Sequence, residues 1–142
     1  MAQVTVARLD DQIAWYDARS AYCQKMFKGL KLAEMVAAAA IPLLAGLTPN
    51  PWVTGALGAA VVVLEGVLHL NQYYANWIAY RSTAEALKHE KYLHAATAGP
   101  YAASEHPDAL LAERVEGLIS QEHAKWVTQQ EQKKQGGADA KR

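Results

Sequence analysis

Apolar residues recur at steps of three or four along most of this chain, and no stretch alternates apolar and polar residues long enough to predict a β-strand. Near the N-terminus, Leu9, Ile13 and Tyr16 follow helical spacing, which predicts an amphipathic helix over residues 9–29. This helix leads directly into an apolar segment, residues 30–47. The pattern predicts an all-α fold.

A short break separates this segment from a second apolar one. Residues 48–51 read Thr-Pro-Asn-Pro, which predicts a chain reversal because proline cannot take part in regular helical hydrogen bonding. The second apolar segment covers residues 52–72, and its helical pattern continues over residues 73–96. Beyond Leu70 no glycine or proline occurs before residue 99, so the sequence predicts one continuous helix of more than forty residues.

The last part of the chain predicts one further helix and a polar tail. Pro107 suits the first position of a helix and Asp108 suits its first turn, so a helix is expected over residues 107–130. Residues 131–142 contain no apolar residue other than alanine, which predicts a disordered tail. Residues 1–130 are therefore expected to form a single domain.

The two apolar segments fit either the core of a soluble protein or a membrane. Thirteen apolar residues rise only about 20 Å, whereas the hydrocarbon core of a bilayer is about 30 Å thick. Lysines precede the first segment and Arg81 and two lysines follow the second, while the turn is uncharged. This distribution, with Trp52 at the turn and Tyr73, Tyr74, Trp77 and Tyr80 at the other end, is typical of a membrane hairpin with both termini in the cytoplasm.

Carboxylates at the foot of each segment make the pattern unusual. Glu34 precedes the turn and Glu65 follows it by similar distances, so the two should lie at one depth. The apolar side chains of the first segment contribute about 3 kcal/mol of insertion free energy, and one charge in mid-membrane costs about as much. Glu34 is therefore expected near the interface, beside a partner such as Lys31 or His69, or facing water, and the same holds for Glu65.

Polar residues of the second segment share one face if they are placed at about 100° per residue on a helix. A row of this kind could line a pore, with an acidic ring, a titratable ring and a hydrophobic constriction. The alternative is that the row packs against Lys31 and Glu34 of the neighbouring segment. The pore-lining candidates are Thr54, Gly58, Val61, Val62, Glu65, His69, Gln72 and Asn76, and small residues beside them suited to close helix packing are Gly55, Ala59 and Gly66.

Composition adds mainly exclusions. The 142 residues carry no formal net charge and no basic face, which argues against nucleic acid as a partner. Cys23 is the only cysteine and is expected to be a small buried hydrophobe. His89 and His94 are five residues apart on a predicted helix, so they do not form a metal-binding pair. No catalytic site, metal or cofactor is predicted, and the N-terminus lacks the apolar core of a signal peptide.

Four sequence elements resemble a known family. They are IAWYDARS (residues 13–20), VLEG (63–66), NWIAYRSTAEALKHEK (76–91) and LLAERVEGLISQEHAKW (110–126), and they are similar to the SLATT superfamily in its branch described as a bacterial domain of unknown function. The resemblance implies a two-transmembrane protein of the bacterial inner membrane, and in many members a pore-forming effector of prokaryotic defence or signalling systems. Residues that match the family pattern and are expected to build a cytoplasmic bundle are Trp15, Tyr16, Trp77, Arg81, Glu85, Glu90, Glu113, Glu116 and Trp126.

Three functions follow as hypotheses. The first is a homo-oligomeric membrane pore or ion channel, in which copies of the hairpin align the polar row. The second is a non-conducting membrane adaptor whose cytoplasmic helices recruit a partner. The third, a soluble four-helix interaction protein, requires that the hairpin is not inserted in a membrane.

Overall fold

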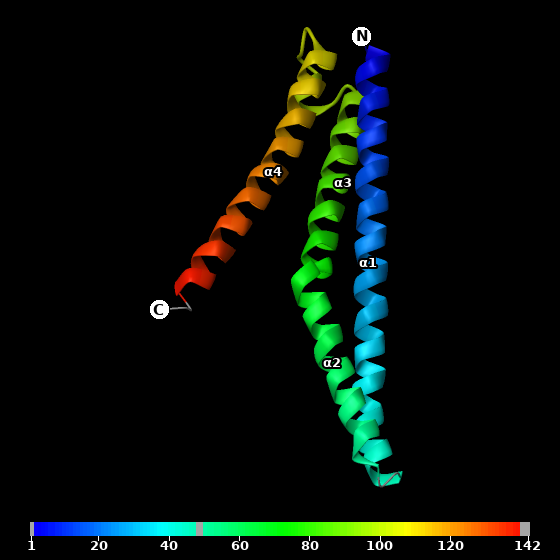
Figure 1. The fold of residues 1–142 in the computed structure, drawn as a ribbon. Helices are drawn as coiled ribbons and strands as arrows, with labels where there is room; N and C mark the ends of the chain where they lie inside the picture. Colours follow the sequence, from blue (N-terminus) through cyan, green and yellow to red (C-terminus); the bar gives the residue numbers. More distant parts are fainter. Residues whose placement is uncertain (1, 48–49, 140–142) are drawn as a thin grey trace. The chain divides into compact units, whose positions relative to one another are not determined.

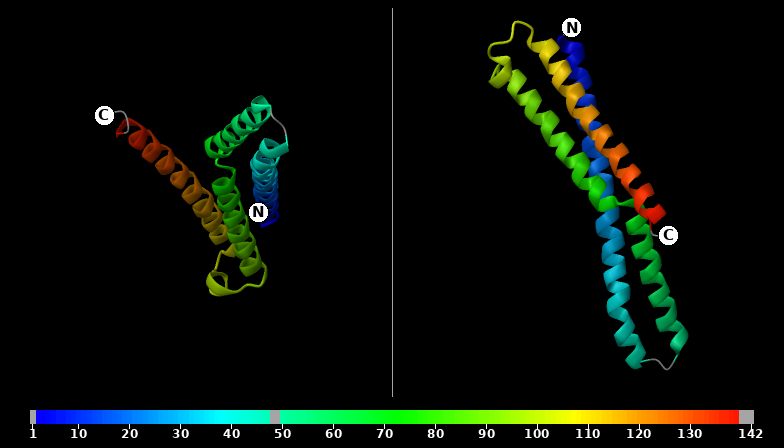
Figure 2. Two further views of the ribbon diagram at one scale, coloured as in Figure 1. Left: turned by 90° about the horizontal axis from the view of Figure 1, so that it is seen from below. Right: turned by 90° about the vertical axis from the view of Figure 1, so that its left-hand side faces the viewer.

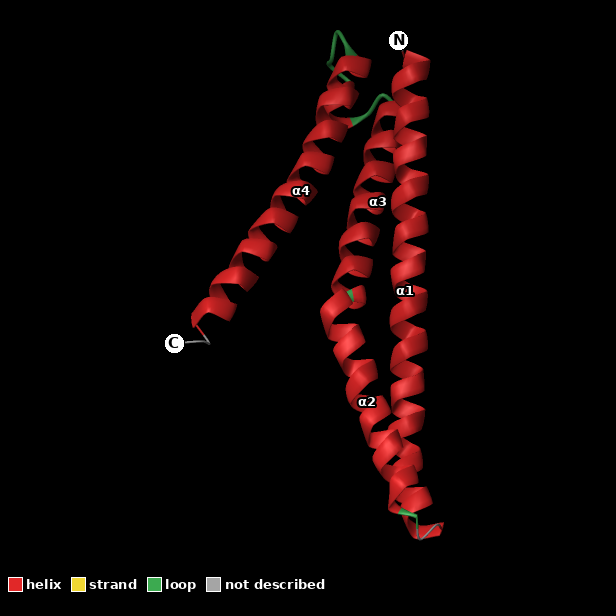
Figure 3. Ribbon diagram, in the orientation of Figure 1, coloured by secondary structure: helices red, strands yellow, loops and turns green. Residues whose placement is uncertain are grey.

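The computed structural model describes residues 2–47 and 50–139, and within those ranges it contains helices and loops but no strand (Figures 1 and 3). This confirms the predicted all-α fold. The elements are α1 (Ala2–Leu47), α2 (Pro51–Asn71), α3 (Tyr73–Ala95), the short 3-10 helix η1 (Gly99–Tyr101) and α4 (Pro107–Asp139). Residues 48 and 49 of the predicted turn lie outside the described residues.

The chain divides into two compact units that share the long helices α1 and α3. The hairpin unit comprises Ala18–Ile78, and the bundle unit comprises Met1–Asp17 together with Ala79–Arg142.

In the hairpin unit, the second half of α1 lies beside α2, and the chain reverses direction between them (Figure 1). Asn50 starts α2 as its N-cap, because its side-chain oxygen accepts a hydrogen bond from the backbone N–H of Trp52 at 3.1 Å. Pro51 follows at the first helical position, where its missing N–H is not needed. One helical turn later, the Thr54 hydroxyl donates a hydrogen bond to the Pro51 carbonyl at 3.0 Å.

The predicted continuous helix from residue 52 to residue 96 is wrong at one point. Gln72 adopts a left-handed conformation, with φ of 48°, and separates α2 from α3. Side-chain amides near Gln72 compete with backbone N–H groups for backbone carbonyl oxygens. The Asn71 amide donates to the Val67 carbonyl at 2.9 Å, and the Asn76 amide donates to the Asn71 carbonyl at 3.1 Å. In an uninterrupted helix, backbone N–H groups donate to these carbonyl groups. The helix ends in this polar sequence because the side-chain amides donate to the carbonyl groups as well.

In the bundle unit, the first turns of α1 pack with α3 and α4 (Figure 2). Leu9, Leu87, Tyr101 and Leu111 are each at most 1% exposed. These residues come from α1, α3, η1 and α4, so one core joins segments that are far apart in sequence. The complete buried cluster is Leu9, Tyr16, Ala84, Leu87, Tyr101, Leu111 and Val115.

Helix α4 continues to Asp139, nine residues beyond the expected end at residue 130. The segment from residue 131, in which composition predicts disorder, therefore has a helical backbone as far as Asp139. Glutamine, lysine and glutamate favour helix even where no apolar side chain is available for packing.

Candidate functional site

Three charged side chains meet in the hairpin unit and form an ion triad. Lys31 Nζ lies 3.0 Å from a carboxylate oxygen of Glu34 and 3.1 Å from one of Glu65. The enclosed oxygen of Glu34 accepts no hydrogen bond, so electrostatic attraction holds that pair. With both carboxylates ionised the triad carries one net negative charge. The structure therefore brings Lys31 and Glu34, which the sequence predicted as intramembrane polar partners, into contact with Glu65, which it predicted as a pore-lining residue.

The residues of the predicted polar row differ in exposure. Thr54, Gly58 and Val61 are partly buried, whereas Val62 is 71% exposed and Glu65 and His69 are also exposed. Gln72 and Asn76 are partly buried. The position of Asn76 was predicted for a helix that continues unbroken past residue 72, whereas the left-handed Gln72 interrupts that helix.

The small residues Gly55 and Ala59 lie on exposed positions of α2, and Gly66 is partly buried. A Cβ atom placed on Gly55, Gly58 or Gly66 would meet nothing within 4 Å. The glycines are therefore not required for packing within one copy of the hairpin.

Apolar side chains of the hairpin are largely uncovered. Leu43 is 66% exposed, Trp52 is 83% exposed, and Leu32, Met35 and Val36 are exposed as well. Two helical stretches are long and apolar enough to cross a membrane, and 0% and 6% of their most apolar windows are buried. A core helix of a soluble protein passes the same test of length and composition, but its apolar residues are mostly buried.

Aromatic side chains gather at the opposite end of the hairpin unit from the turn. Tyr22 packs edge-on against Tyr73 with ring centroids 6.5 Å apart, and Phe27 packs against Tyr74 at 5.2 Å. Tyr74 in turn contacts Trp77 at 5.9 Å. These five rings, Tyr22, Phe27, Tyr73, Tyr74 and Trp77, are called the aromatic cluster below. The sequence predicted aromatic residues at this level from α3 but did not predict their partners on α1.

In the bundle unit, Glu90 is a predicted bundle residue that makes an enclosed polar contact. Glu90 is 6% exposed and accepts hydrogen bonds from Tyr101 Oη at 2.6 Å, Arg114 Nε at 2.8 Å and Arg114 Nη2 at 2.7 Å. The Arg114 hydrogen bond, opposed by burial, holds the pKa of Glu90 below its usual value. Burial and the neighbouring Glu90 raise the pKa of Tyr101 to about 12. Beside them, a His94 nitrogen lies 3.0 Å from a carboxylate oxygen of Asp108.

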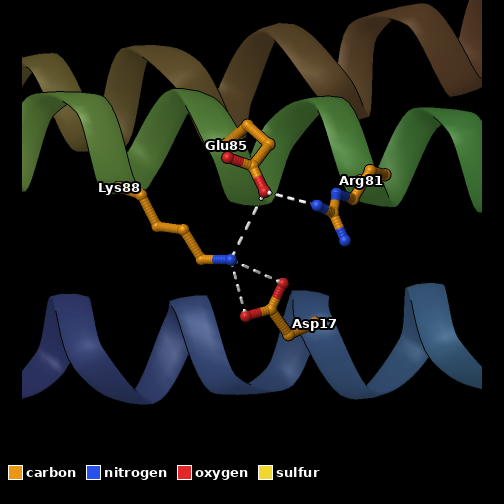
Figure 4. A network of polar contacts seen from close by, with 4 residues as sticks. All are labelled: Asp17, Arg81, Glu85 and Lys88. Atoms are coloured by element: carbon orange, nitrogen blue, oxygen red, sulfur yellow. Dashed lines mark hydrogen bonds and ion pairs between the residues drawn. The ribbon is translucent and has the colours of Figure 1, made fainter.

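A second network of the bundle unit lies between α1 and α3 (Figure 4). Lys88 Nζ lies 2.9 Å from one carboxylate oxygen of Asp17 and 3.5 Å from Glu85, and Arg81 contacts Glu85 at 3.1 Å. The hydrogen bond to Asp17 raises the pKa of Lys88. Arg81 and Glu85 are exposed, and the side chains of Lys88 and Asp17 are 39% and 40% exposed, so the network orients the helices more than it stabilises them.

The other predicted bundle residues differ in environment. Tyr16 is buried and its ring contacts those of Trp15 and Tyr80, while Trp15 itself is half exposed. Glu116 pairs with Arg8 at 2.6 Å, and Glu113 is exposed. Trp77 belongs to the hairpin unit rather than to the bundle, and the side chain of Trp126 lies outside the described residues.

Sequence reasoning missed several polar residues that the structure brings into contact. Tyr101 and Arg114 complete the Glu90 contact, and Asp17 and Lys88 join α1 to α3. The one available signal for Tyr101 was an aromatic residue directly after Gly-Pro in an otherwise small and polar loop. Cys23 is buried, as predicted. Among the side chains that the structure describes, no group of three or more histidine, cysteine, aspartate or glutamate residues could hold a metal ion.

These observations define an all-helical protein with two helices long and apolar enough to cross a membrane. The chain belongs to the DUF4231 family, described as "Protein of unknown function (DUF4231)", whose profile matches residues 11–109, well over half of the sequence. No curated protein and no solved structure matches the chain.

Proposed function

We propose that the hairpin inserts into a membrane, assembles with further copies and forms a pathway for ions. The observation that carries this proposal is the exposure of the apolar hairpin around a charged triad. An apolar surface of this extent requires a covering of lipid or protein. Charged side chains such as Lys31, Glu34 and Glu65 are costly in such a surface, so they indicate a function beyond packing.

The dimensions of α1 support insertion. From Lys31 to Leu47 the helix rises about 24 Å, and from Tyr22 to Leu47 about 38 Å. A bilayer has a hydrocarbon core of about 30 Å and a full thickness of about 40–45 Å. A hairpin whose turn lies at the far surface therefore places the triad near the cytoplasmic boundary of the hydrocarbon and the aromatic cluster among the headgroups. Both termini are then cytoplasmic, in the inner membrane if the resemblance to bacterial SLATT proteins holds.

The arrangement of α2 supports a path between copies. Val62, Glu65 and His69 recur at steps of three and four, are exposed, and are flanked by Gly55 and Ala59, which permit close approach of another helix. In a ring of hairpins, Val62 would form a narrow apolar constriction, and Glu65 would form a ring of negative charge next to it. Cations are the expected permeant species because each triad carries one uncompensated negative charge. We propose no catalytic activity and no cofactor.

One contact favours a second candidate function. Glu65 is already paired with Lys31 of its own hairpin, which is the packing arrangement that needs no ring of copies. In that case the hairpin is a membrane anchor and the protein is an adaptor. Its bundle unit, which is held together by the hydrogen bonds of Glu90 and by the buried cluster that includes Leu9, would recruit the partner.

Ion flux from liposomes that contain the purified full chain separates these functions. The parent is compared with Glu65→Gln and with the control Glu113→Gln, which removes an exposed carboxylate from the bundle unit. A pore predicts parent flux, a changed preference between cations and anions in Glu65→Gln, and parent-like flux in the control. Absence of flux in every salt tested, from protein that resists alkaline extraction from the membrane, would reject the pore and favour the adaptor.

A further inference from the structure

Two lysines at the headgroup end of the hairpin unit lack the carboxylate partners found elsewhere in the protein. Lys25 and Lys28 are exposed and form no ion pair with any carboxylate among the residues whose side chains the structure describes. By contrast, five basic residues of the bundle unit pair with carboxylates: Arg8, Arg81, Lys88, Lys91 and Arg114. The two lysines are therefore free to bind an external anion.

The charge balance of the hairpin unit strengthens this contrast. Ala18–Ile78 contains four basic residues, Arg19, Lys25, Lys28 and Lys31, but its acidic residues are only Glu34 and Glu65. Both carboxylates are held by Lys31 in the triad. Arg19 makes an interaction of its own, so Lys25 and Lys28 carry the positive charge that remains on the helical turns of α1 before the triad.

The surroundings of these lysines fit the boundary between lipid tails and headgroups. Lys28 Nζ lies 5.7 Å from the centre of the Trp77 ring, which holds the ammonium beside an aromatic residue without neutralising it. Further along α1, Leu32 and Val36 are exposed and apolar. From Lys25 to Leu32 the helix rises about 10 Å, a distance comparable to the thickness of one headgroup layer.

We infer that Lys25 and Lys28, together with Trp77, bind the phosphate of anionic phospholipid headgroups on the cytoplasmic side of the membrane. This inference rests on the proposed insertion of the hairpin but not on ion conduction. The partner is an anionic lipid rather than a zwitterionic one, because the choline or ethanolamine group of the latter would place a second positive charge beside the lysines.

Competition between lipids tests the inference. The purified full chain in neutral detergent is given equal amounts of phosphatidylglycerol and phosphatidylcholine, and native mass spectrometry measures the ratio of the two lipids retained. One basic residue near an anionic surface strengthens binding about fivefold. Lys25→Gln/Lys28→Gln is therefore expected to lower the retained ratio more than tenfold.

The matched control is Lys88→Gln/Lys91→Gln, which removes the same charge from lysines already paired with Asp17 and Asp10. It is expected to keep the parent's lipid ratio. Equal ratios in the parent and in Lys25→Gln/Lys28→Gln would overturn the inference. Displacement of phosphatidylglycerol by millimolar glycerol 3-phosphate would also overturn it, in favour of a site for soluble phosphates.

The outcome is separable from the proposed function. Alkaline extraction of native membranes tests insertion, and liposome flux tests conduction. A chain that remains in the membrane pellet but shows no preference for phosphatidylglycerol refutes this inference alone. A chain with that preference and no flux refutes the pore alone.

Discussion

Replacement of Glu90 by glutamine tests how strongly the bundle unit depends on one enclosed carboxylate. In the parent, three N–H or O–H groups from Tyr101 and Arg114 donate to its two oxygens at 2.6–2.8 Å. Glutamine has the same shape, but its amide nitrogen is itself a donor and would face a donor on one side. At least one hydrogen bond is lost and the remainder lose their charge assistance.

The expected loss of stability is about 2 kcal/mol. A hydrogen bond to a charged group contributes about 1.5–3 kcal/mol, and a neutral one about 1 kcal/mol. The loss is reduced because glutamine does not require desolvation of a carboxylate at a position that is only 6% exposed. For a unit of this size, 2 kcal/mol lowers the midpoint of thermal unfolding by about 10 °C.

The difference between parent and Glu90→Gln should depend on pH with a definite sign. The pKa of Glu90 is lowered in the folded protein. Its contribution is therefore fully present above the pKa of an unfolded glutamate, about 4.3, and is lost as the pH falls through the folded value. The two proteins should differ most near pH 7 and converge below pH 4.

The measurement is thermal unfolding of the full chain in mild detergent from pH 3 to pH 8, followed by tryptophan fluorescence. Glu113→Gln serves as the control because it removes an exposed carboxylate from the same helix as Arg114. Equal midpoints for the parent and Glu90→Gln at pH 7 would refute the reasoning. A difference that stays constant down to pH 3 would show that the carboxylate charge is not its cause.

Substitutions at three further positions test individual features by the same unfolding measurement. Gln72→Gly should raise the midpoint, because glycine adopts the left-handed conformation without the strain of about 1 kcal/mol that a side chain adds; a lower midpoint would contradict this. Asn50→Ala should destabilise the hairpin by about 1 kcal/mol through loss of the N-cap of α2, whereas Asn50→Ser should retain most of it. Tyr101→Phe should remove part of the stability loss between pH 10 and pH 12, because the pKa of Tyr101 is raised to about 12 and its neutral form favours folding.

Helical periodicity predicted the fold well because it records which side chains face a neighbour. It correctly predicted that the fold is all helical. It could not predict the break at Gln72, since Asn71, Gln72 and Asn76 are each compatible with helix and only their combined side-chain hydrogen bonds end it. A pattern of apolar spacing contains no information about such local competition for backbone groups.

The ion triad and the Glu90 contact show the same limit for the site. Lys31, Glu34 and Glu65 could be associated from sequence because a hairpin pairs residues at similar distances from its turn. Arg114 and Tyr101 could not be assigned to Glu90, because a loop of unpredicted path separates α3 from α4. Pairing within a hairpin follows from chain geometry, whereas pairing across an irregular loop depends on the packed core.

The two candidate functions make opposite predictions for Glu65 because of how charge is shared in the triad. Lys31 neutralises one of two carboxylates, so each copy keeps one negative charge whichever carboxylate it holds. Glu65→Gln leaves Lys31 with Glu34, 3.0 Å away, and the site becomes neutral. A pore should then lose its preference for cations although the hairpin remains intact, because a neutral ion pair does not favour cations over anions. An anchor has no ion to select, so the same neutral pair should leave recruitment of the partner unchanged.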